Sequence, residues 1–377
     1  MTASDHRFHG LVSLLVVPML GIVLAPRGAG AAEFVPGMIY IGDSETSCVH
    51  QAEHRIWEVN PKTGEWRVFA ADPKCPLFQG LTFAPDGSRL RAAAIYARAV
   101  IEFDPDGNMT TVLDQSDGLF APGWITYDSH GDLYVNDIGR IVRFSGGGEP
   151  GEIVADFDDG VREEGSIAFA ADGDLYLAPG GQGPILESQD YVLRFSPQTW
   201  AVSIFDSDFP LTDDPRNVVT DRSGYVYLNF QRTIYRYRAG TPDTRTVLSS
   251  GGPWPFAMAL LPNERFLIAY YTILPRAGER LSRVVSVDVR DGSVETLTSI
   301  EDLGFSVGGL AVVPYVGPRA DTDTDGDVDA ADFAWFLGCV TGPDGTMQPA
   351  CGLTDLDHDL DVDFADFGIL QQSVTSP

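Results

Sequence analysis

Short apolar stretches that end in polar turns recur about every forty residues between residues 34 and 314. Each opening stretch ends in a turn of Asp, Ser, Asn or Gly, the residues that tolerate turn backbones. A recurrence of this length indicates a repeat architecture. The openings cover residues 80–87, 124–131, 166–173 and 217–224, with a more divergent copy at 257–264.

Three more apolar stretches follow each opening and complete a unit of four predicted strands. Four antiparallel strands per unit, repeated radially, are typical of an all-β propeller. The second strands cover residues 133–135, 175–177, 226–228 and 266–268. The third strands cover 101–103, 141–144, 192–195, 234–237 and 284–287, and outer strands include 110–113, 201–204 and 295–297.

The two ends of the repeat region complement each other. Residues 38–41, 55–59 and 66–69 supply strands two to four of a unit that lacks its first strand, and a matching stretch lies at 309–314. Pairing of the two ends closes the ring and leaves no sheet edge open. We therefore predict a six-bladed propeller over residues 33–316, closed by its C-terminal strand.

This region resembles the six-bladed propellers of the NHL, gluconolactonase and streptogramin-lyase families. The resemblance rests on the apolar strand, the Asp/Gly turn, the Leu-Tyr-Val strand and the Arg-Phe strand of each unit, and it extends over residues 33–316. Such a fold hosts enzymes and binding scaffolds alike, so the resemblance implies architecture more than activity.

Two acidic segments of twelve residues, 321–332 and 355–366, predict calcium loops in a small helical module over residues 317–377. Ca²⁺ takes six to eight oxygen ligands, which alternate residues of a tightly turning loop can supply. Both segments carry Asp at positions 1, 3, 5, 7, 9 and 12 and Val at position 8. The predicted ligands are Asp321, Asp323, Asp325, Asp327, Asp329 and Asp332 in the first loop and Asp355, Asp357, Asp359, Asp361, Asp363 and Asp366 in the second.

The two loops differ at position 6. Gly326 supplies the positive φ that the sharp turn requires, whereas the second loop has Leu360 there. A non-Gly residue in the left-handed region costs roughly 1–2 kcal/mol, so the second site should be the weaker one. The alternative interpretation is a solvated acidic tail, because blocks of like charge repel one another.

The tandem loops resemble a dockerin, a paired-calcium-loop module that docks onto cohesins in bacterial extracellular assemblies. The resemblance covers about the last sixty residues and implies calcium binding and a cohesin-like partner. In this chain Gly338 is predicted to end the first helix at Leu337, and Cys339 and Cys351 flank an inserted loop. The recognition residues that dockerins carry on their helices have no counterpart here.

Charge narrows the range of partners. The formal net charge of the 377-residue chain is −29, and residues 317–377 hold 13 Asp and one Arg with no Glu or Lys, so 13 − 1 gives −12 there. Nucleic acid and anionic membranes both demand a basic surface and are therefore excluded as partners.

The N-terminal 32 residues have the pattern of a secretory signal. Arg7 precedes an apolar run over residues 11–24, and Ala29-Gly-Ala31 provides a small-residue cleavage pattern, with cleavage near Ala31 or Ala32. The run is too short for a good membrane span. The protein is thus expected outside the cytoplasm, secreted or at the cell surface, without a membrane-spanning segment.

Four cysteines fit an oxidising compartment. Four cysteines allow three pairings, and the sequence alone does not choose among them. Cys339 with Cys351 would staple the insertion in the calcium module, and Cys48 with Cys75 would join two loops in the first third of the chain. Zinc binding is the rival interpretation, but no CxxC pair or His cluster accompanies the cysteines, which favours disulfides.

Polar residues at the ends of inner strands should line the mouth of the propeller channel. The resemblance to gluconolactonase-like propellers implies that such oxygens hold a divalent ion. In the structural alternative Glu164 pairs with Arg216 and Asn217 caps a strand end. Aromatic residues near the mouth, Trp124 among them, either stack on sugars or pack between blades. The candidates are Glu164, Asn217, Asp137, Asp43 and Arg216.

Two functions follow. The first is a non-enzymatic binding or assembly protein, whose propeller recognises a carbohydrate, small molecule or protein and whose calcium module attaches it to a partner. The alternative is a metal-dependent, lactonase-like hydrolase or a lyase. Lyases of this shape need His on inner strands, and His50, His54, His130 and His358, the histidines after the signal, lie elsewhere. Catalytic residues therefore remain unassigned.

Overall fold

The computed structural model divides the chain into two compact units, residues 1–32 and 33–377. The structure describes residues 32–42, 53–147, 150–156, 165–179, 191–209, 215–230, 232–251, 257–273, 281–300, 308–343 and 345–374. The predicted secretory segment, except Ala32, lies outside these residues, and so do Asp43, Cys48 and Glu164. No described helix is long and apolar enough to cross a bilayer.

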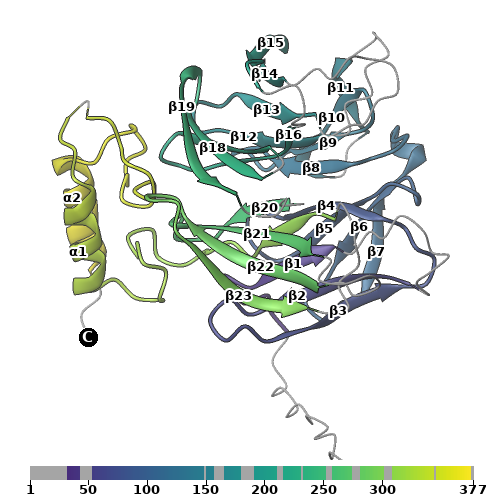
Figure 1. The fold of residues 1–377 in the computed structure, drawn as a ribbon, viewed down its shortest axis with the longest axis horizontal. Coiled ribbons are helices and arrows are strands. Elements are labelled where there is room, and N and C mark those ends of the chain that lie inside the picture. Colours follow the sequence, from purple (N-terminus) through teal and green to yellow (C-terminus); the bar gives the residue numbers. More distant parts are fainter. Residues whose placement is uncertain are drawn as a thin grey trace, which may run out of the picture. The chain divides into compact units, whose positions relative to one another are not determined.

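Six antiparallel sheets of four strands each form the body of the protein, as predicted (Figure 1). We number these sheets as blades 1 to 6. Blade 1 consists of β24 (Leu310–Val312), β1 (Ile39–Gly42), β2 (His54–Val59) and β3 (Trp66–Asp72). Blade 2 consists of β4 (Phe78–Phe83), β5 (Leu90–Ala94), β6 (Ala99–Phe103) and β7 (Met109–Leu113). Blade 3 consists of β8 (Trp124–Tyr127), β9 (Leu133–Asn136), β10 (Arg140–Phe144) and β11 (Glu152–Asp156).

The other three blades repeat the same order of strands. Blade 4 consists of β12 (Ser166–Phe169), β13 (Leu175–Ala178), β14 (Val192–Ser196) and β15 (Ala201–Asp206). Blade 5 consists of β16 (Pro215–Thr220), β17 (Tyr225–Phe230), β18 (Thr233–Arg238) and β19 (Thr241–Ser250). Blade 6 consists of β20 (Ala257–Leu260), β21 (Phe266–Ile273), β22 (Leu281–Asp288) and β23 (Val294–Ile300).

The first strands of the blades form a closed ring. Each of β24, β4, β8, β12, β16 and β20 contacts the first strand of the next blade, and β20 returns to β24. The ring requires close packing of backbones: a Cβ on Gly80 would lie 2.6 Å from the Cα of Trp124. Glycine at this position lets the first strands of blades 2 and 3 approach each other.

Blade 1 is assembled from both ends of the repeat region, as predicted. Ile39 is opposite Val312 and Ile41 is opposite Leu310 in an antiparallel ladder. Two further hydrogen bonds extend this pairing, from Gly42 N to Gly309 O (2.9 Å) and from Val313 N to Met38 O (3.0 Å). β1 therefore has a hydrogen-bonded neighbour on each side, which removes a template for edge-to-edge aggregation at the point of closure.

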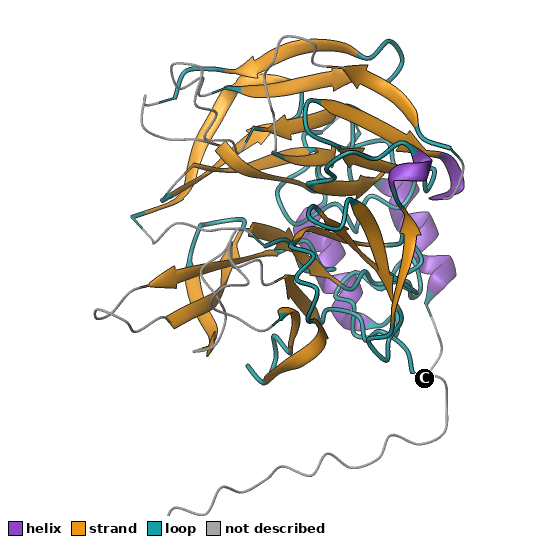
Figure 2. Ribbon diagram, turned by 90° about the vertical axis from the view of Figure 1, so that its right-hand side faces the viewer, coloured by secondary structure: helices purple, strands orange, loops and turns teal. Residues whose placement is uncertain are grey.

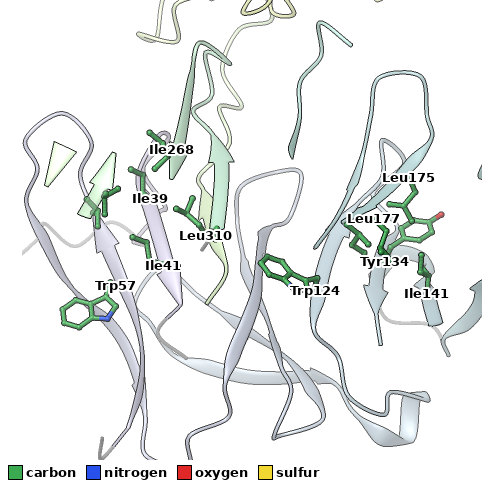
Figure 3. Packing of buried hydrophobic residues seen from close by; sticks show 14 of the residues in the cluster. Ile39, Ile41, Trp57, Trp124, Tyr134, Ile141, Leu175, Leu177, Ile268 and Leu310 are labelled. Atoms are coloured by element: carbon green, nitrogen blue, oxygen red, sulfur yellow. The ribbon is translucent and has the colours of Figure 1, made fainter. Parts of the chain in front are cut away.

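Apolar side chains fill the space between adjacent blades. Ile39, Ile41, Trp124 and Leu177 belong to one buried cluster, and Figure 3 shows members of this cluster on several blades. Second strands such as β9 and β13 are buried along their whole length, because neighbouring blades cover both faces. Outer strands such as β15 are mostly exposed. Burial thus decreases from the inner to the outer strands of a blade, which explains why the second strands are mostly apolar in sequence.

Two helices follow the propeller, α1 (Ala330–Cys339) and α2 (Phe364–Ser373). Figure 2 shows them together with the short 3-10 turns η1 (Gln115–Asp117) and η2 (Ser145–Gly147). Both α1 and α2 begin with an Asp N-cap and a reciprocal capping box. The prediction that Gly338 ends the first helix is wrong: α1 continues through Gly338 to Cys339, which is buried and disulfide-bonded.

We predict that truncating a side chain at the ring closure destabilises the propeller. Ile41 is fully buried in the ladder with β24, so Ile41→Ala should lower the free energy of unfolding by about 2–5 kcal/mol. Ile153 lies on an outer strand and is 49% exposed, so Ile153→Ala should change it by less than about 0.5 kcal/mol. Urea unfolding of both variants measures the difference, and equal losses would contradict a closure role for Ile41.

Candidate calcium loops and their contact with the propeller

The predicted calcium ligands lie in four compact groups of carboxylates. Within each group one oxygen per residue lies within 4.8 Å of the others. The groups are Asp321, Asp323 and Asp325; Asp327, Asp329 and Asp332; Asp355, Asp357 and Asp359; and Asp361, Asp363 and Asp366. The structure therefore brings all twelve predicted residues into two matching loops.

The carboxylate at position 1 shapes each loop by accepting backbone hydrogen bonds. Asp321 accepts from Asp325 N (3.1 Å) and Gly326 N (2.8 Å). In the second loop Asp355 accepts from Asp359 N (3.1 Å) and Leu360 N (3.0 Å). The same turn is thus built twice from the same residue type.

The carboxylate at position 12 closes each loop from the first turn of a helix. Asp332 accepts from Thr322 N (2.5 Å) and Asp329 N (2.7 Å), and its side chain is fully buried. Asp366 repeats this with Leu356 N (2.5 Å) and Asp363 N (2.8 Å). Each loop is therefore fixed to its helix by the acidic residue that the sequence pattern placed there.

Position 6 has positive φ in both loops, as predicted. Gly326 adopts φ +114° and Leu360 adopts φ +75°. A Cβ on Gly326 would meet nothing within 4 Å, so backbone strain rather than a clash favours glycine there. Leu360 keeps the turn in the second loop at the cost of that strain.

The loop carboxylates repel one another. Burial, followed by the charges of Asp332 and Asp325, raises the pKa of Asp323 to about 6. The charge of Asp325 is the main cause that raises the pKa of Asp327. Burial is the main cause that raises the pKa of Asp355. The loops thus concentrate oxygen donors whose negative charge a hard cation would neutralise, and the donor set fits calcium.

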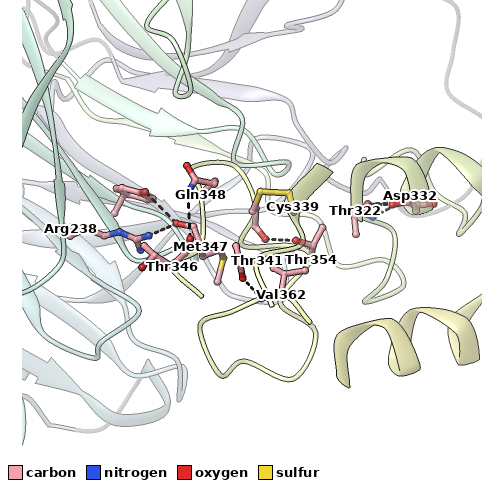
Figure 4. The surroundings of a disulfide bond; sticks show 12 residues. Arg238, Thr322, Asp332, Cys339, Thr341, Thr346, Met347, Gln348, Thr354 and Val362 are labelled. Atoms are coloured by element: carbon pink, nitrogen blue, oxygen red, sulfur yellow. Dashed lines mark hydrogen bonds between the residues drawn. A yellow bond between two sulfur atoms is a disulfide. The ribbon is translucent and has the colours of Figure 1, made fainter. Parts of the chain in front are cut away.

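The two loops share one small apolar core. Val328 and Val362, at position 8 of each loop, are fully buried together with Phe336 and Leu370. Two hydrogen bonds link the halves, from Thr341 N to Val362 O (2.9 Å) and from Val362 N to the Thr341 hydroxyl (3.1 Å) (Figure 4). The matching valines that the sequence pattern singled out therefore hold the loops together.

The disulfide-bonded insertion touches the propeller. Cys339 and Cys351 are bonded, as predicted, with their Cα atoms 5.5 Å apart. Between them the Met347 carbonyl accepts hydrogen bonds from the Tyr225 hydroxyl (3.3 Å) and from the Arg238 guanidinium (Figure 4). The insertion, which departs from the dockerin pattern, is thus an attachment point.

The insertion also packs against the propeller through apolar side chains. Ala350, also in the insertion, packs in the apolar cluster between blades 5 and 6. The insertion therefore contacts the propeller through apolar surface as well as through hydrogen bonds.

Cys75, in the propeller, is also disulfide-bonded.

The first candidate calcium loop is linked to the closing strand as well. The hydroxyl of Tyr315, five residues beyond Leu310, donates a hydrogen bond to Asp321. Burial and this contact raise the pKa of Tyr315, which keeps the hydroxyl protonated as a donor. The position 1 carboxylate and the strand that closes the ring are therefore joined through one side chain.

The channel candidates that the structure describes form structural contacts. Asn217 accepts from Met258 N (3.2 Å), which joins blade 5 to blade 6. Asp137 accepts from Phe120 N (2.9 Å) and forms an ion pair with Arg140. Arg216 lies half-buried on β16. These contacts favour a structural role for Asn217 and indicate one for Asp137 as well; the Glu164 of the expected pair with Arg216 lies outside the described residues.

Three other aromatic and polar residues of the blades also have packing or hydrogen-bonding roles. Trp124 is buried in the cluster between blades, which favours packing over sugar stacking. His54 is buried on β2, where its Nδ1 accepts from Leu77 N (2.8 Å), so it has a structural role. Asn136 donates to Gly165 O (2.7 Å), another bond from blade to blade. Polar residues of the inner strands thus serve to join the blades.

Sequence reasoning missed a buried acidic pair beneath the insertion. Asp221 accepts from Tyr225 N and from the Tyr227 hydroxyl, both at 2.7 Å. Glu264 accepts from Arg222 N (3.1 Å) and has φ +53°. The sequence does mark Glu264 as unusual: in the divergent fifth opening it replaces the turn glycine that the other openings carry.

Comparisons with known proteins agree with the fold. No protein-family model matches the chain, and no curated protein matches it. A solved nidogen–laminin complex is similar with 16% identity and a TM-score of 0.57, covering 74% of this chain and 98% of that chain. A Xanthomonas campestris gluconolactonase (14%, TM-score 0.48, covering 76% and 91%) and a Staphylococcus aureus virginiamycin B lyase (15%, TM-score 0.44, covering 66% and 78%) are also similar. At these identities the likeness is one of fold.

We predict opposite effects of exchanging glycine and leucine at position 6. Gly326→Leu should lower the free energy of unfolding of the C-terminal module by about 1–2 kcal/mol, because leucine is strained at positive φ. Leu360→Gly should raise it by up to about 1 kcal/mol, since relief of strain exceeds the entropy that glycine adds to the unfolded chain. Denaturation at one fixed calcium concentration measures both, and a shift of the same sign in both variants would contradict the assignment.

We predict that the buried acidic pair makes stability depend on pH. Burial, followed by the charge of Glu264, raises the pKa of Asp221 to about 7. Because an unfolded Asp has a pKa of about 3.9, the folded state binds the extra proton between these values, and stability should fall as the pH rises through this range. In Asp221→Asn the dependence should be shallower by up to about 1.4 kcal/mol per pH unit. Urea unfolding at pH 5 and pH 8 in excess calcium checks this, and an unchanged slope would contradict it.

Proposed function

We propose that this protein is a secreted, non-enzymatic binding protein whose C-terminal loops bind calcium. The observation that carries the proposal is the duplicated loop, in which carboxylate oxygens form groups of three that lie within 4.8 Å of one another and the same backbone hydrogen bonds recur. Bound calcium would supply positive charge at the centre of each loop. Asp321, Asp323, Asp325 and Asp332 would hold it in the first loop.

The chain's own residues determine what calcium would stabilise. Asp332 and Asp366 connect their loops to the helices, and Asp321 is bound to Tyr315 beside the closing strand. Neutralising the loop carboxylates would therefore favour the helices and their contact with the propeller together. Because a preformed site is absent from an unfolded chain, binding energy would contribute to folding energy.

The outer surface of the module is proposed to attach the protein to a cohesin-like or other extracellular protein. Phe333 and Leu337 lie one helical turn apart on α1 and are 41% and 58% exposed. Phe364, the first residue of α2, is 86% exposed. Exposed apolar residues of this kind suit a protein partner. The resemblance to dockerins supports the same role.

The propeller is proposed to act as a recognition scaffold. Asp137 and Asn217 are committed to backbone hydrogen bonds, which favours a scaffold over a metal-dependent lactonase or a lyase. The bonded cysteines fit an oxidising compartment outside the cytoplasm. The secretory signal over residues 1–32 stays a prediction.

Calorimetry and thermal melting of residues 33–377 test the proposal. We expect calcium to bind with measurable heat at two sites and to raise the stability of the module, by about 2.7 kcal/mol at one hundred times the dissociation constant. Asp325→Ala should abolish binding at the first site, because it removes a predicted ligand. Asp208→Ala is the control, since the Asp208 side chain is 97% exposed and lies on the propeller.

Two results would contradict calcium binding. One is the absence of heat on titration with calcium, and the other is an identical melting curve with and without chelator. Loss of binding in Asp208→Ala as well as in Asp325→Ala would instead indicate nonspecific screening of the acidic chain.

A further inference from the structure

A cavity of about 430 Å³ lies between blades 5 and 6 of the propeller and the first helix of the C-terminal module. This volume is within the range of small-molecule sites. Arg236 and Arg290 line it from the propeller, and Trp335, Gln348 and Pro349 line it from the module. None of the described residues that line it is acidic, although the chain as a whole has a net charge of −29. A positively charged cavity in so acidic a protein favours an anionic ligand.

Arg236 differs from the arginines at the equivalent position of other blades. Each is the third residue of the run that forms the third strand, as in Ile141-Val-Arg143 and Val192-Leu-Arg194. Arg143 pairs with Glu152 (2.5 Å), and Arg194 pairs with Asp174. Among the described residues no carboxylate oxygen lies within 4.0 Å of the Arg236 guanidinium.

The contacts of Arg236 hold its guanidinium without neutralising it. Nη1 donates to the Val289 carbonyl (2.6 Å), and the guanidinium carbon lies 5.5 Å from the centre of the Tyr225 ring. The neighbouring Arg290, by contrast, has its charge neutralised by Asp288, which accepts two hydrogen bonds from it at 3.1 and 2.9 Å. Arg236 is therefore the cationic group of this cavity that is best able to pair with a ligand oxyanion.

The module side of the cavity provides a surface for the rest of such a ligand. The indole Nε1–H of Trp335 is buried and has no hydrogen-bond acceptor among the described residues. Gln348 donates to the Thr346 carbonyl (3.4 Å), which leaves its amide oxygen available to accept. Trp335 and Pro349 add apolar area. Indole, amide and guanidinium groups together suit a hydroxylated ring that carries a carboxylate.

We propose that this cavity binds a small sugar acid, with its carboxylate on Arg236 and its ring against Trp335 and Pro349. The site is separate from the calcium loops and from the propeller channel. It is formed jointly by the propeller and the module, so it exists only while the insertion between Cys339 and Cys351 packs against blade 5.

Calorimetry on residues 33–377 in excess calcium tests the proposal with three probes. D-Galacturonate is the sugar acid, D-galactose is its neutral counterpart, and sulfate is a bare anion. We expect galacturonate to bind at least about tenfold more tightly than either of the others, because a charge-assisted hydrogen bond contributes about that factor. Equal binding of galactose, equal binding of sulfate, or no binding of galacturonate would each overturn it.

Matched variants locate the site. Arg236→Gln keeps a donor near Val289 but removes the charge, so galacturonate affinity should fall about tenfold or more. Arg143→Gln, at the equivalent position of blade 3, should leave it unchanged. Trp335→Phe keeps an aromatic ring, removes the indole N–H and should weaken binding about fivefold. Thermal melting of each variant shows whether it folds; a folded Arg236→Gln variant that binds normally overturns the assignment.

Discussion

The pairing of β24 with β1 is the interaction on which the rest of the structure depends. It converts a linear series of repeats into a ring in which each first strand has a neighbour on both sides. Without it, blade 1 would lack its inner strand and two blades would expose apolar faces. The same strand leads directly to Tyr315, which binds the first carboxylate of the first acidic loop. The short ladder between β24 and β1 thus closes the ring and also places Tyr315 next to the C-terminal module.

The acidic C-terminal module contacts a part of the propeller that carries several arginines. Arg238 binds the Met347 carbonyl, and the Arg265 guanidinium lies 5.8 Å from the centre of the Trp335 ring. These contacts use arginine as a donor and as a cation over aromatic rings rather than in ion pairs with the loop carboxylates. The repulsion within the loops consequently remains inside the module, where calcium binding would relieve it.

Departures from the repeat occur where the propeller meets the module. Glu264 replaces a turn glycine and lies buried near Asp221, and Arg236 lacks the carboxylate that its counterparts have in blades 3 and 4. By contrast, inner-strand polar groups such as Asn217 join one blade to the next. The proposed ligand cavity therefore lies where the repeat pattern is altered, rather than in the propeller channel.

The order of the strands, the closure by a terminal strand and the two acidic loops followed from the sequence, because each depends on local patterns: apolar periodicity, turn residues and aspartates at fixed spacing. The end of α1 at Cys339 did not, since the contacts of the insertion sustain a helix through Gly338. Nor did the proximity of Asp221 and Glu264, or the cavity around Arg236 and Trp335. These features bring together residues far apart in the chain, and only the packed tertiary structure decides which charges find a partner.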